Sequence, residues 1–230
     1  MTPISFHQSS IRKILSSLDI SKTPGSDGIP AIFFKNCAPG LTPVLCRLFS
    51  LSFDSGICPD CWKLALVQPI PNKGDKSLPS NYRPISLVSI LSKVTEKAIN
   101  SQLLSHLEQS SLFSDRFRGG RSAGDLLLYT THLWNSNIEK YGKTLAVALD
   151  LSKAFDRVWH DAFLNKLPSF GLQPNLCKRI SSFLNHRSFK VMSDGALSKS
   201  FPMNAGVPQD SVLSMLASLN CDLQQIVHWG

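Results

Sequence analysis

The sequence of 230 residues contains no apolar run near the roughly 20 residues that a membrane-spanning helix needs. Its longest apolar stretches, such as residues 145–149, have the length of a core segment. Residues 1–20 are polar and amphipathic, and they lack the compact apolar stretch of a secretory signal. These absences predict an intracellular protein, in the nucleus or the cytoplasm, that has no membrane partner.

Charged residues are also few, at 17%, whereas apolar residues make up 43% of the chain. This balance is enough to fill a core and excludes wholesale disorder. Of the six cysteines only Cys58 and Cys61 have a Cys-x-x-Cys spacing, and no second pair completes the four ligands of a zinc site. We therefore expect a folded chain whose cysteines are reduced.

Positive charge is in excess, with 24 Lys and Arg against 16 Asp and Glu. The excess is even, because residues 1–110 hold 11 basic and 7 acidic residues and residues 111–230 hold 13 and 9. A distributed basic surface suits a phosphate backbone that runs across the whole molecule. Charge alone, however, favours a slightly basic soluble domain without such a partner.

Apolar periodicity and turn residues predict an α+β fold. Helices are expected over 11–18, 31–35, 41–53, 90–107, 122–139, 163–170, 176–184 and 211–227. Strands are expected over 64–70 and 83–88, joined by a basic loop, over 144–149, and over 188–192 and 196–201 around a tight turn.

An aspartate, Asp150, stands at the end of the apolar strand predicted to finish at residue 149. Ligands commonly bind where such strands end, and Mg²⁺ prefers hard oxygen ligands. An aspartate after a strand is more often a helix N-cap. The residue types alone therefore leave both interpretations open.

Five segments, in order, resemble the reverse transcriptase domain of non-LTR retrotransposons, especially the jockey-type lineage. They are residues 24–30, 81–87, 117–122, 148–156 and 206–214. The second resembles the family's fingers motif, and the last two resemble its first and second palm motifs. The resemblance implies a right-handed polymerase that grips an RNA template and a DNA primer. It divides the chain into a helical N-terminal extension (1–60), a fingers-like part (61–142) and an incomplete palm (143–230), with the thumb absent.

The resemblance also implies roles for particular residues. Asp150 would be the catalytic carboxylate and first Mg²⁺ ligand, together with the backbone carbonyl of Leu151. Phe155 would be the steric gate that excludes a ribose 2′-hydroxyl. Arg83 would grip the triphosphate of the incoming dNTP, assisted by Lys73, because a guanidinium binds phosphate in bidentate fashion.

Four further positions would contact the nucleotide or the nucleic acid. Gln209 would seat the nucleotide and template, Arg118 and Arg121 would meet template or phosphate backbone, and Asp27 would belong to an extension lying along the nucleic acid. From the residues alone simpler interpretations remain. Arg83 could pair with an acid such as Asp75, Phe155 could be a core residue, and the loop arginines could be solvated.

The sequence departs from the family at its second carboxylate motif. Two-cation phosphoryl transfer needs several oxygens around ions about 4 Å apart, and the family supplies them from an aromatic-Ala-Asp-Asp turn. No two aspartates are adjacent anywhere in this sequence. After Ser214 come residues 215–220 and then residues 221–230, and the last of these resemble the helix that follows the turn in the family, so an internal deletion is indicated. The prediction is a catalytically inactive reverse transcriptase remnant; the alternative is a non-catalytic module that binds RNA, DNA or protein.

Overall fold

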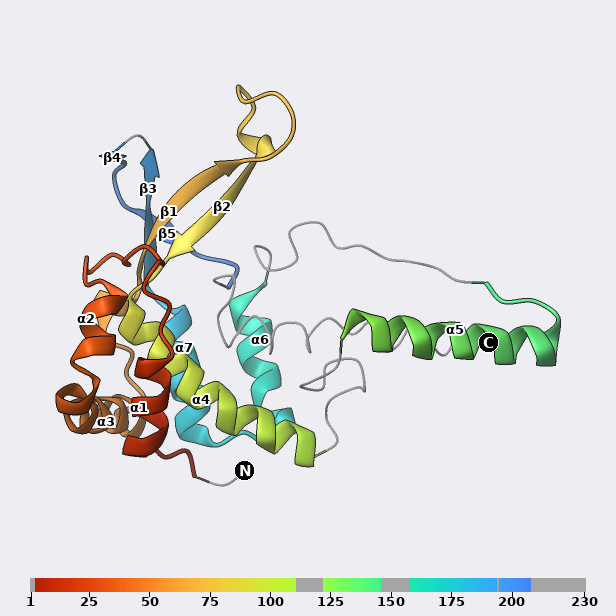
Figure 1. Ribbon diagram of the computed structural model, residues 1–230, viewed down its shortest axis with the longest axis horizontal. Helices are drawn as coiled ribbons and strands as arrows, with labels where there is room; N and C mark the ends of the chain where they lie inside the picture. Colours follow the sequence, from red (N-terminus) through yellow and green to blue (C-terminus); the bar gives the residue numbers. More distant parts are fainter. Residues whose placement is uncertain (1–2, 111–121, 146–157, 194, 208–230) are drawn as a thin grey trace.

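The computed structural model describes residues 3–110, 122–145, 158–193 and 195–207, which combine helices with a mixed sheet (Figure 1). The helices are α1 (Gln8–Ser16), α2 (Ala31–Asn36), α3 (Ala38–Ser55), α4 (Ile90–Gln109), α5 (Ala123–Tyr141), α6 (His160–Lys166) and α7 (Pro174–Leu184). The strands are β1 (Leu64–Pro71), β2 (Tyr82–Leu87), β3 (Arg187–Ser193), β4 (Ala196–Leu197) and β5 (Phe201–Met203). No helix within these described ranges is long and apolar enough to cross a membrane.

The sheet is built on the hairpin of β1 and β2, which confirms the two strands predicted on either side of a basic loop. These strands pair antiparallel, with Val67 opposite Ser86 and Pro69 opposite Pro84. On its other side β1 pairs in parallel with β3, which also carries β4 and β5 as antiparallel neighbours. A segment more than a hundred residues further along the chain therefore completes the sheet that the hairpin begins.

The second predicted hairpin forms only in part. β3 and β4 flank the expected turn, but β4 ends at Leu197 and the next strand begins at Phe201. Just past β4, Ser198 still contacts β3, because its N–H donates to the Val191 carbonyl and its hydroxyl oxygen accepts from the Val191 N–H, each at 2.9 Å. The expected continuous strand over 196–201 is nevertheless wrong.

The core lies where α1, α3, α4 and α7 meet. Phe49 of α3 is fully buried. The centroid of its ring lies 5.8 Å from the ring centroid of Phe6 and 6.1 Å from that of Trp62. Leu15 from α1 and Leu103 from α4 are buried in the same cluster. The apolar side chains whose helical spacing is visible in the sequence thus form one buried cluster between the helices.

One predicted helix is interrupted, and two other predicted elements lie wholly or partly outside the described residues. The helix predicted over 163–170 begins earlier, at His160, and ends at Lys166, after which residues 167–170 form a 3₁₀ turn. Pro168 explains the break, because proline lacks the N–H that an α-helix needs at that place. The helix predicted over 211–227, and the strand predicted over 144–149 from residue 146 onward, lie outside the described residues.

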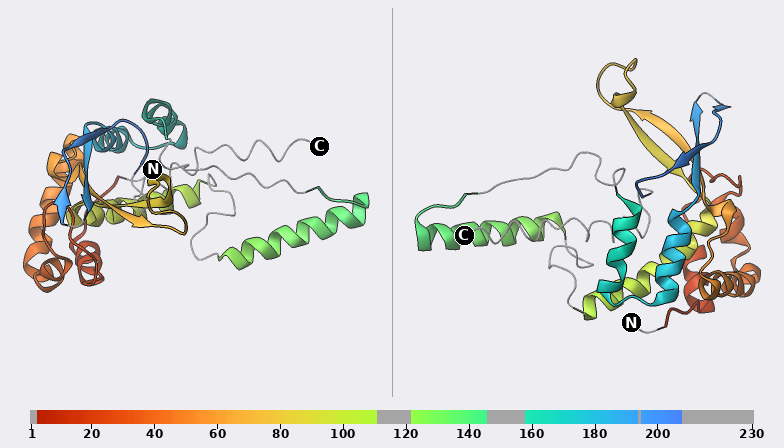
Figure 2. Two further views of the ribbon diagram at one scale, coloured as in Figure 1. Left: turned by 90° about the horizontal axis from the view of Figure 1, so that it is seen from above. Right: turned by 180° about the vertical axis from the view of Figure 1, so that it is seen from behind.

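Helix α5 extends away from the rest of the molecule (Figures 1 and 2). It begins at a capping box, in which Ser122 and Asp125 bond each other's backbone N–H, and ends at Gly142 with φ 74°. Both features are standard helix limits. Several large apolar side chains along it are exposed, namely Leu127, Leu128, Tyr129, Leu133, Trp134, Ile138 and Tyr141.

Candidate nucleotide and nucleic-acid site

A groove of about 360 Å³ lies between the sheet and the segment that follows β5. It is lined by Val67, Pro84, Ser86, Phe189, Pro202, Met203, Asn204, Ala205, Gly206 and Val207. Pro84 and Ser86 belong to the predicted fingers motif, and Gly206 and Val207 open the predicted second palm motif. The fold therefore brings two motifs, more than a hundred residues apart in sequence, to one groove.

Gly206 connects this groove to the residues just after the first palm motif. Its N–H donates to the carbonyl of Val158 at 3.0 Å, and its own carbonyl accepts from Nε2 of the buried His160 at 2.7 Å. Gly206 has φ 82°, a conformation in which a side chain is strained. His160 is not predictable from the sequence, because a histidine four residues past a motif carries no recognisable pattern.

The loop at the tip of the β1–β2 hairpin is held by its own hydrogen bonds. The Asp75 carboxylate accepts from the Ser77 N–H and hydroxyl, each at 2.8 Å, and the Asn81 amide donates to the Asp75 carbonyl at 2.8 Å. The bonds from Ser77, that from its N–H first, keep the pKa of the Asp75 carboxyl below its usual value. The loop is thereby fixed without using its cations.

Arg83 and Lys73 are both exposed on this hairpin. Within the described residues no ion pair joins Arg83 to Asp75, so the simplest alternative for this arginine is not observed. Arg83 lies opposite Ile70 in the ladder. Because side chains alternate along a strand, Arg83 lies on the face of β2 opposite to that of Pro84 and Ser86. The guanidinium therefore borders the hairpin surface and does not line the groove.

Asp27 lies in the loop between α1 and α2. Its carboxylate accepts from the Ser89 hydroxyl at 2.7 Å and from the Ile29 N–H at 3.3 Å. Ser89 is the residue directly before α4, and the neighbouring Ser26 donates to the Leu64 carbonyl at 2.9 Å. Asp27 thus holds the start of α4, and its predicted contact with nucleic acid stays a prediction.

The remaining predicted site residues lie outside the described part of the chain. They are Arg118, Arg121, Asp150, Leu151, Phe155 and Gln209. In the part that is described, no cluster of three or more His, Cys, Asp or Glu side chains could hold a metal ion. The predicted Mg²⁺ site therefore stays a prediction.

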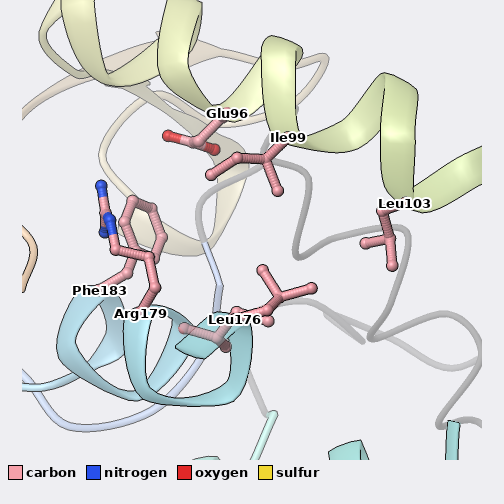
Figure 3. Close-up of a pocket in the computed structure, with 7 residues that line it drawn as sticks. Glu96, Ile99, Leu103, Leu176, Arg179 and Phe183 are labelled. Carbon is pink, nitrogen blue, oxygen red and sulfur yellow. The ribbon is translucent and has the colours of Figure 1, made fainter. Parts of the chain in front are cut away.

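Two buried arginines, which the sequence analysis missed, lie beneath the sheet. Figure 3 shows Glu96 of α4 facing Arg179 and Phe183 of α7 across a cavity of about 30 Å³. Arg187, the first residue of β3, donates to the Phe183 carbonyl at 3.3 Å, and its guanidinium lies 4.3 Å from the Phe183 ring. Burial lowers the pKa of Arg187. These contacts fix β3 against α7, and no local sequence pattern marks an arginine for burial.

The mixed fold of helices and sheet is consistent with what comparison with known proteins shows. Residues 70–221 match the family described as "Reverse transcriptase (RNA-dependent DNA polymerase)". The chain is 32% identical over 218 residues, or 90% of its length, to the "Probable RNA-directed DNA polymerase from transposon BS" of Drosophila melanogaster. It is 30% identical over 207 residues, or 88% of its length, to the "RNA-directed DNA polymerase from mobile element jockey" of the same species.

The chain belongs to the reverse transcriptase family, and its relatives are polymerases of non-LTR retrotransposons. The resemblance that the five motifs indicated is thereby confirmed. The "Probable RNA-directed DNA polymerase from transposon X-element" of Drosophila melanogaster is 28% identical over 92% of the chain. The aligned chain spans 23%, 22% and 24% of the BS, jockey and X-element proteins respectively.

Proposed function

We propose that this chain is a reverse transcriptase domain that binds an RNA template and a DNA primer but does not polymerise. The observation that carries the proposal is chemical: the family's motifs are present in order, yet no two aspartates are adjacent in the sequence. Members of the family generally use a divalent metal. Asp150 and the backbone carbonyl of Leu151 offer fewer oxygens than a two-cation site requires, so we derive no metal-dependent step.

In this proposal the hairpin supplies the contacts to phosphate. Arg83 and Lys73 are exposed, and neither forms an ion pair with another described residue. Hydrogen bonds within the loop hold the hairpin. The side chains of Arg83 and Lys73 therefore stay available to bind phosphate. Arg118, Arg121 and Gln209 would extend the surface, Phe155 would border the nucleotide, and Asp27 would lie at its N-terminal side.

In the same site, the groove would hold the base and sugar of the nucleotide. Its lining includes Pro84 and Ser86 on β2 together with Gly206 and Val207, and none of the described residues that line it is charged. Such a lining suits the flat faces of nucleotides. The proposed division into residues 1–60, 61–142 and 143–230 places the two sides of the groove in the fingers-like part and the incomplete palm, which the β1–β3 pairing joins in one sheet.

Binding to nucleic acid is expected to depend steeply on salt. Fluorescence anisotropy of a labelled RNA–DNA hybrid, titrated between about 50 and 200 mM salt, should show log K falling linearly with log salt. Arg83→Ala and Lys73→Ala should each weaken binding by roughly 3- to 10-fold and lower the magnitude of the slope by about 1. An affinity that does not change with salt would refute the proposal.

Matched controls separate these two cations from the general positive charge. Arg12 and Lys13 are exposed on α1, far from the hairpin loop (Figure 1). Arg12→Ala and Lys13→Ala remove the same charges, so each should change the affinity by less than about 2-fold at about 150 mM salt. If all four variants lose affinity equally, the hairpin has no special part in binding.

A second candidate function, a protein-interaction module, is favoured by α5. Its exposed apolar side chains, such as Leu128 and Trp134, form a surface of the kind that marks partner sites. A chain that fails to bind the hybrid even at about 50 mM salt would favour this function over the first.

A further inference from the structure

Helix α3 carries a second apolar face, in addition to the one that enters the core. Val44, Leu48 and Leu51 are 64%, 38% and 53% exposed, whereas most apolar side chains on the inner face are buried. Their spacing of i, i+4 and i+7 places them in one line along the helix. We call these three residues the α3 stripe. Its spacing is that of a seam between two packed helices.

Two opposite charges lie along one edge of the α3 stripe. Arg47 and Asp54 are both exposed and seven residues apart, so they lie on the same side, about 10 Å apart along the helix axis. Neither forms an ion pair with another described residue. The other edge holds Leu45 and Ser52, which are buried in the chain's own core. A partner helix would therefore meet charged side chains only on the edge of Arg47 and Asp54.

We propose that the α3 stripe binds the α3 stripe of a second copy of this chain, with the two helices antiparallel. A two-fold axis between Leu48 and Leu51 would place Leu48 of each copy against Leu51 of the other. The same axis brings Arg47 of one copy beside Asp54 of the second, so two ion pairs form by symmetry. In a parallel pairing the charged edge of each helix would lie beside the Leu45 and Ser52 edge of the other, so these ion pairs would not form. The charge pattern thus selects both the occupant and its direction.

The position of α3 leaves room for this contact. The helix lies at the outer side of the helical cluster, at the end of the molecule away from α5 (Figures 1 and 2). It packs against α1, α2 and α7. One helix face from each copy gives a small interface, below the roughly 1,200 Å² of stable complexes, so the dimer should be weak and dissociate at low concentration. The inference is independent of the proposed nucleic-acid site.

Sedimentation equilibrium of the full 230-residue chain tests the proposal. Between about 1 and 100 μM, a range suited to a micromolar Kd, the mean mass should rise from 25.4 kDa toward twice that value. Leu48→Glu should keep the chain monomeric throughout this range. Arg47→Asp and Asp54→Arg should each weaken the dimer at least about 10-fold, because each places like charges opposite one another.

The double variant, Arg47→Asp with Asp54→Arg, is the decisive one. It exchanges the two charges, so opposite charges face each other again and the Kd should return to within about 3-fold of the unchanged chain. Arg12→Asp makes the same charge change on α1 and should leave the Kd unchanged. All these positions are exposed, and circular dichroism should report an unchanged fold.

Three results would each overturn the proposal. The first is a chain that stays monomeric at about 100 μM, which would leave the α3 stripe to a different protein or to nucleic acid. The second is a dimer that Leu48→Glu does not affect but that Leu128→Glu on α5 abolishes. The third is a double variant that remains as weak as the single ones.

Discussion

Replacing Phe49 with alanine is expected to lower the free energy of unfolding by about 3–5 kcal/mol. The ring is 0% exposed and touches the rings of Phe6 and Trp62. Its removal leaves a cavity where α1 and α3 meet, and the surrounding side chains can fill it only in part. Urea unfolding followed by circular dichroism measures the change.

Phe33 provides the matched control for this truncation. It is also a phenylalanine on a helix, α2, but it is 46% exposed and contacts the ring of Phe34. Phe33→Ala should therefore cost no more than about 1 kcal/mol. Equal losses for the two variants would mean that the core does not centre on Phe49.

Replacing Gly25 with alanine is the second change with a large expected effect. A Cβ atom at this position would lie 2.3 Å from the carbonyl oxygen of Val88 and 2.6 Å from the backbone nitrogen of Ser89. Backbone atoms cannot rotate away, so the loop must move from the start of α4 and the bond from Ser89 to Asp27 must break. We expect a loss of at least about 2 kcal/mol in the free energy of unfolding.

Gly40→Ala is the control, and its expected effect has the opposite sign. Gly40 lies in the first turns of α3, and a Cβ there would meet no atom within 4 Å. Alanine should stabilise the helix by roughly 0.5–1 kcal/mol, because it restricts the unfolded chain and fits the helix. The Lys93 N–H donates to the Ser89 carbonyl at 3.2 Å, so hydrogen exchange at the Lys93 amide should rise in Gly25→Ala and stay unchanged in Gly40→Ala. Unchanged exchange in both would contradict the close packing of Gly25.

Local pattern was sufficient to predict much of the secondary structure. The run at 64–70, the glycine-containing loop and the run at 83–88 predict the β1–β2 hairpin, because alternation and turn residues act over a few positions. The apolar periodicity over 90–107 likewise predicts α4. Pro168 is a local signal for the end of a helix, and the helix predicted over 163–170 is too long because it runs through this proline.

Contacts between distant segments could not be predicted in this way. Nothing local indicates that Leu64 pairs with Ser188 across the sheet, or that Arg187 is buried beneath it. The close packing of Gly25 is also not predictable from local sequence, because its approach to Val88 depends on the position of α4. These features arise from tertiary packing, which a single sequence does not encode in any short window.

The candidate site likewise has features that the sequence predicts and features that only the fold shows. The motifs themselves were recognisable, and the groove joins the fingers motif to the start of the second palm motif through Pro84 and Gly206. The face on which Arg83 lies, and the bond from His160 to Gly206, follow only from the paired strands and the packed helix. The family resemblance predicts the roles of the site residues, whereas the fold determines which residues lie beside them.

Primer extension by the 230-residue chain shows whether this reverse transcriptase domain polymerises. The assay uses a DNA primer annealed to an RNA template, the four deoxynucleoside triphosphates, and Mg²⁺ or Mn²⁺. Binding of the same hybrid, followed by anisotropy, shows that the protein is folded and engaged. We expect a bound primer that is not lengthened with either metal, and no difference between the unchanged chain and Asp150→Ala. A lengthened primer, lost in Asp150→Ala, would contradict this expectation.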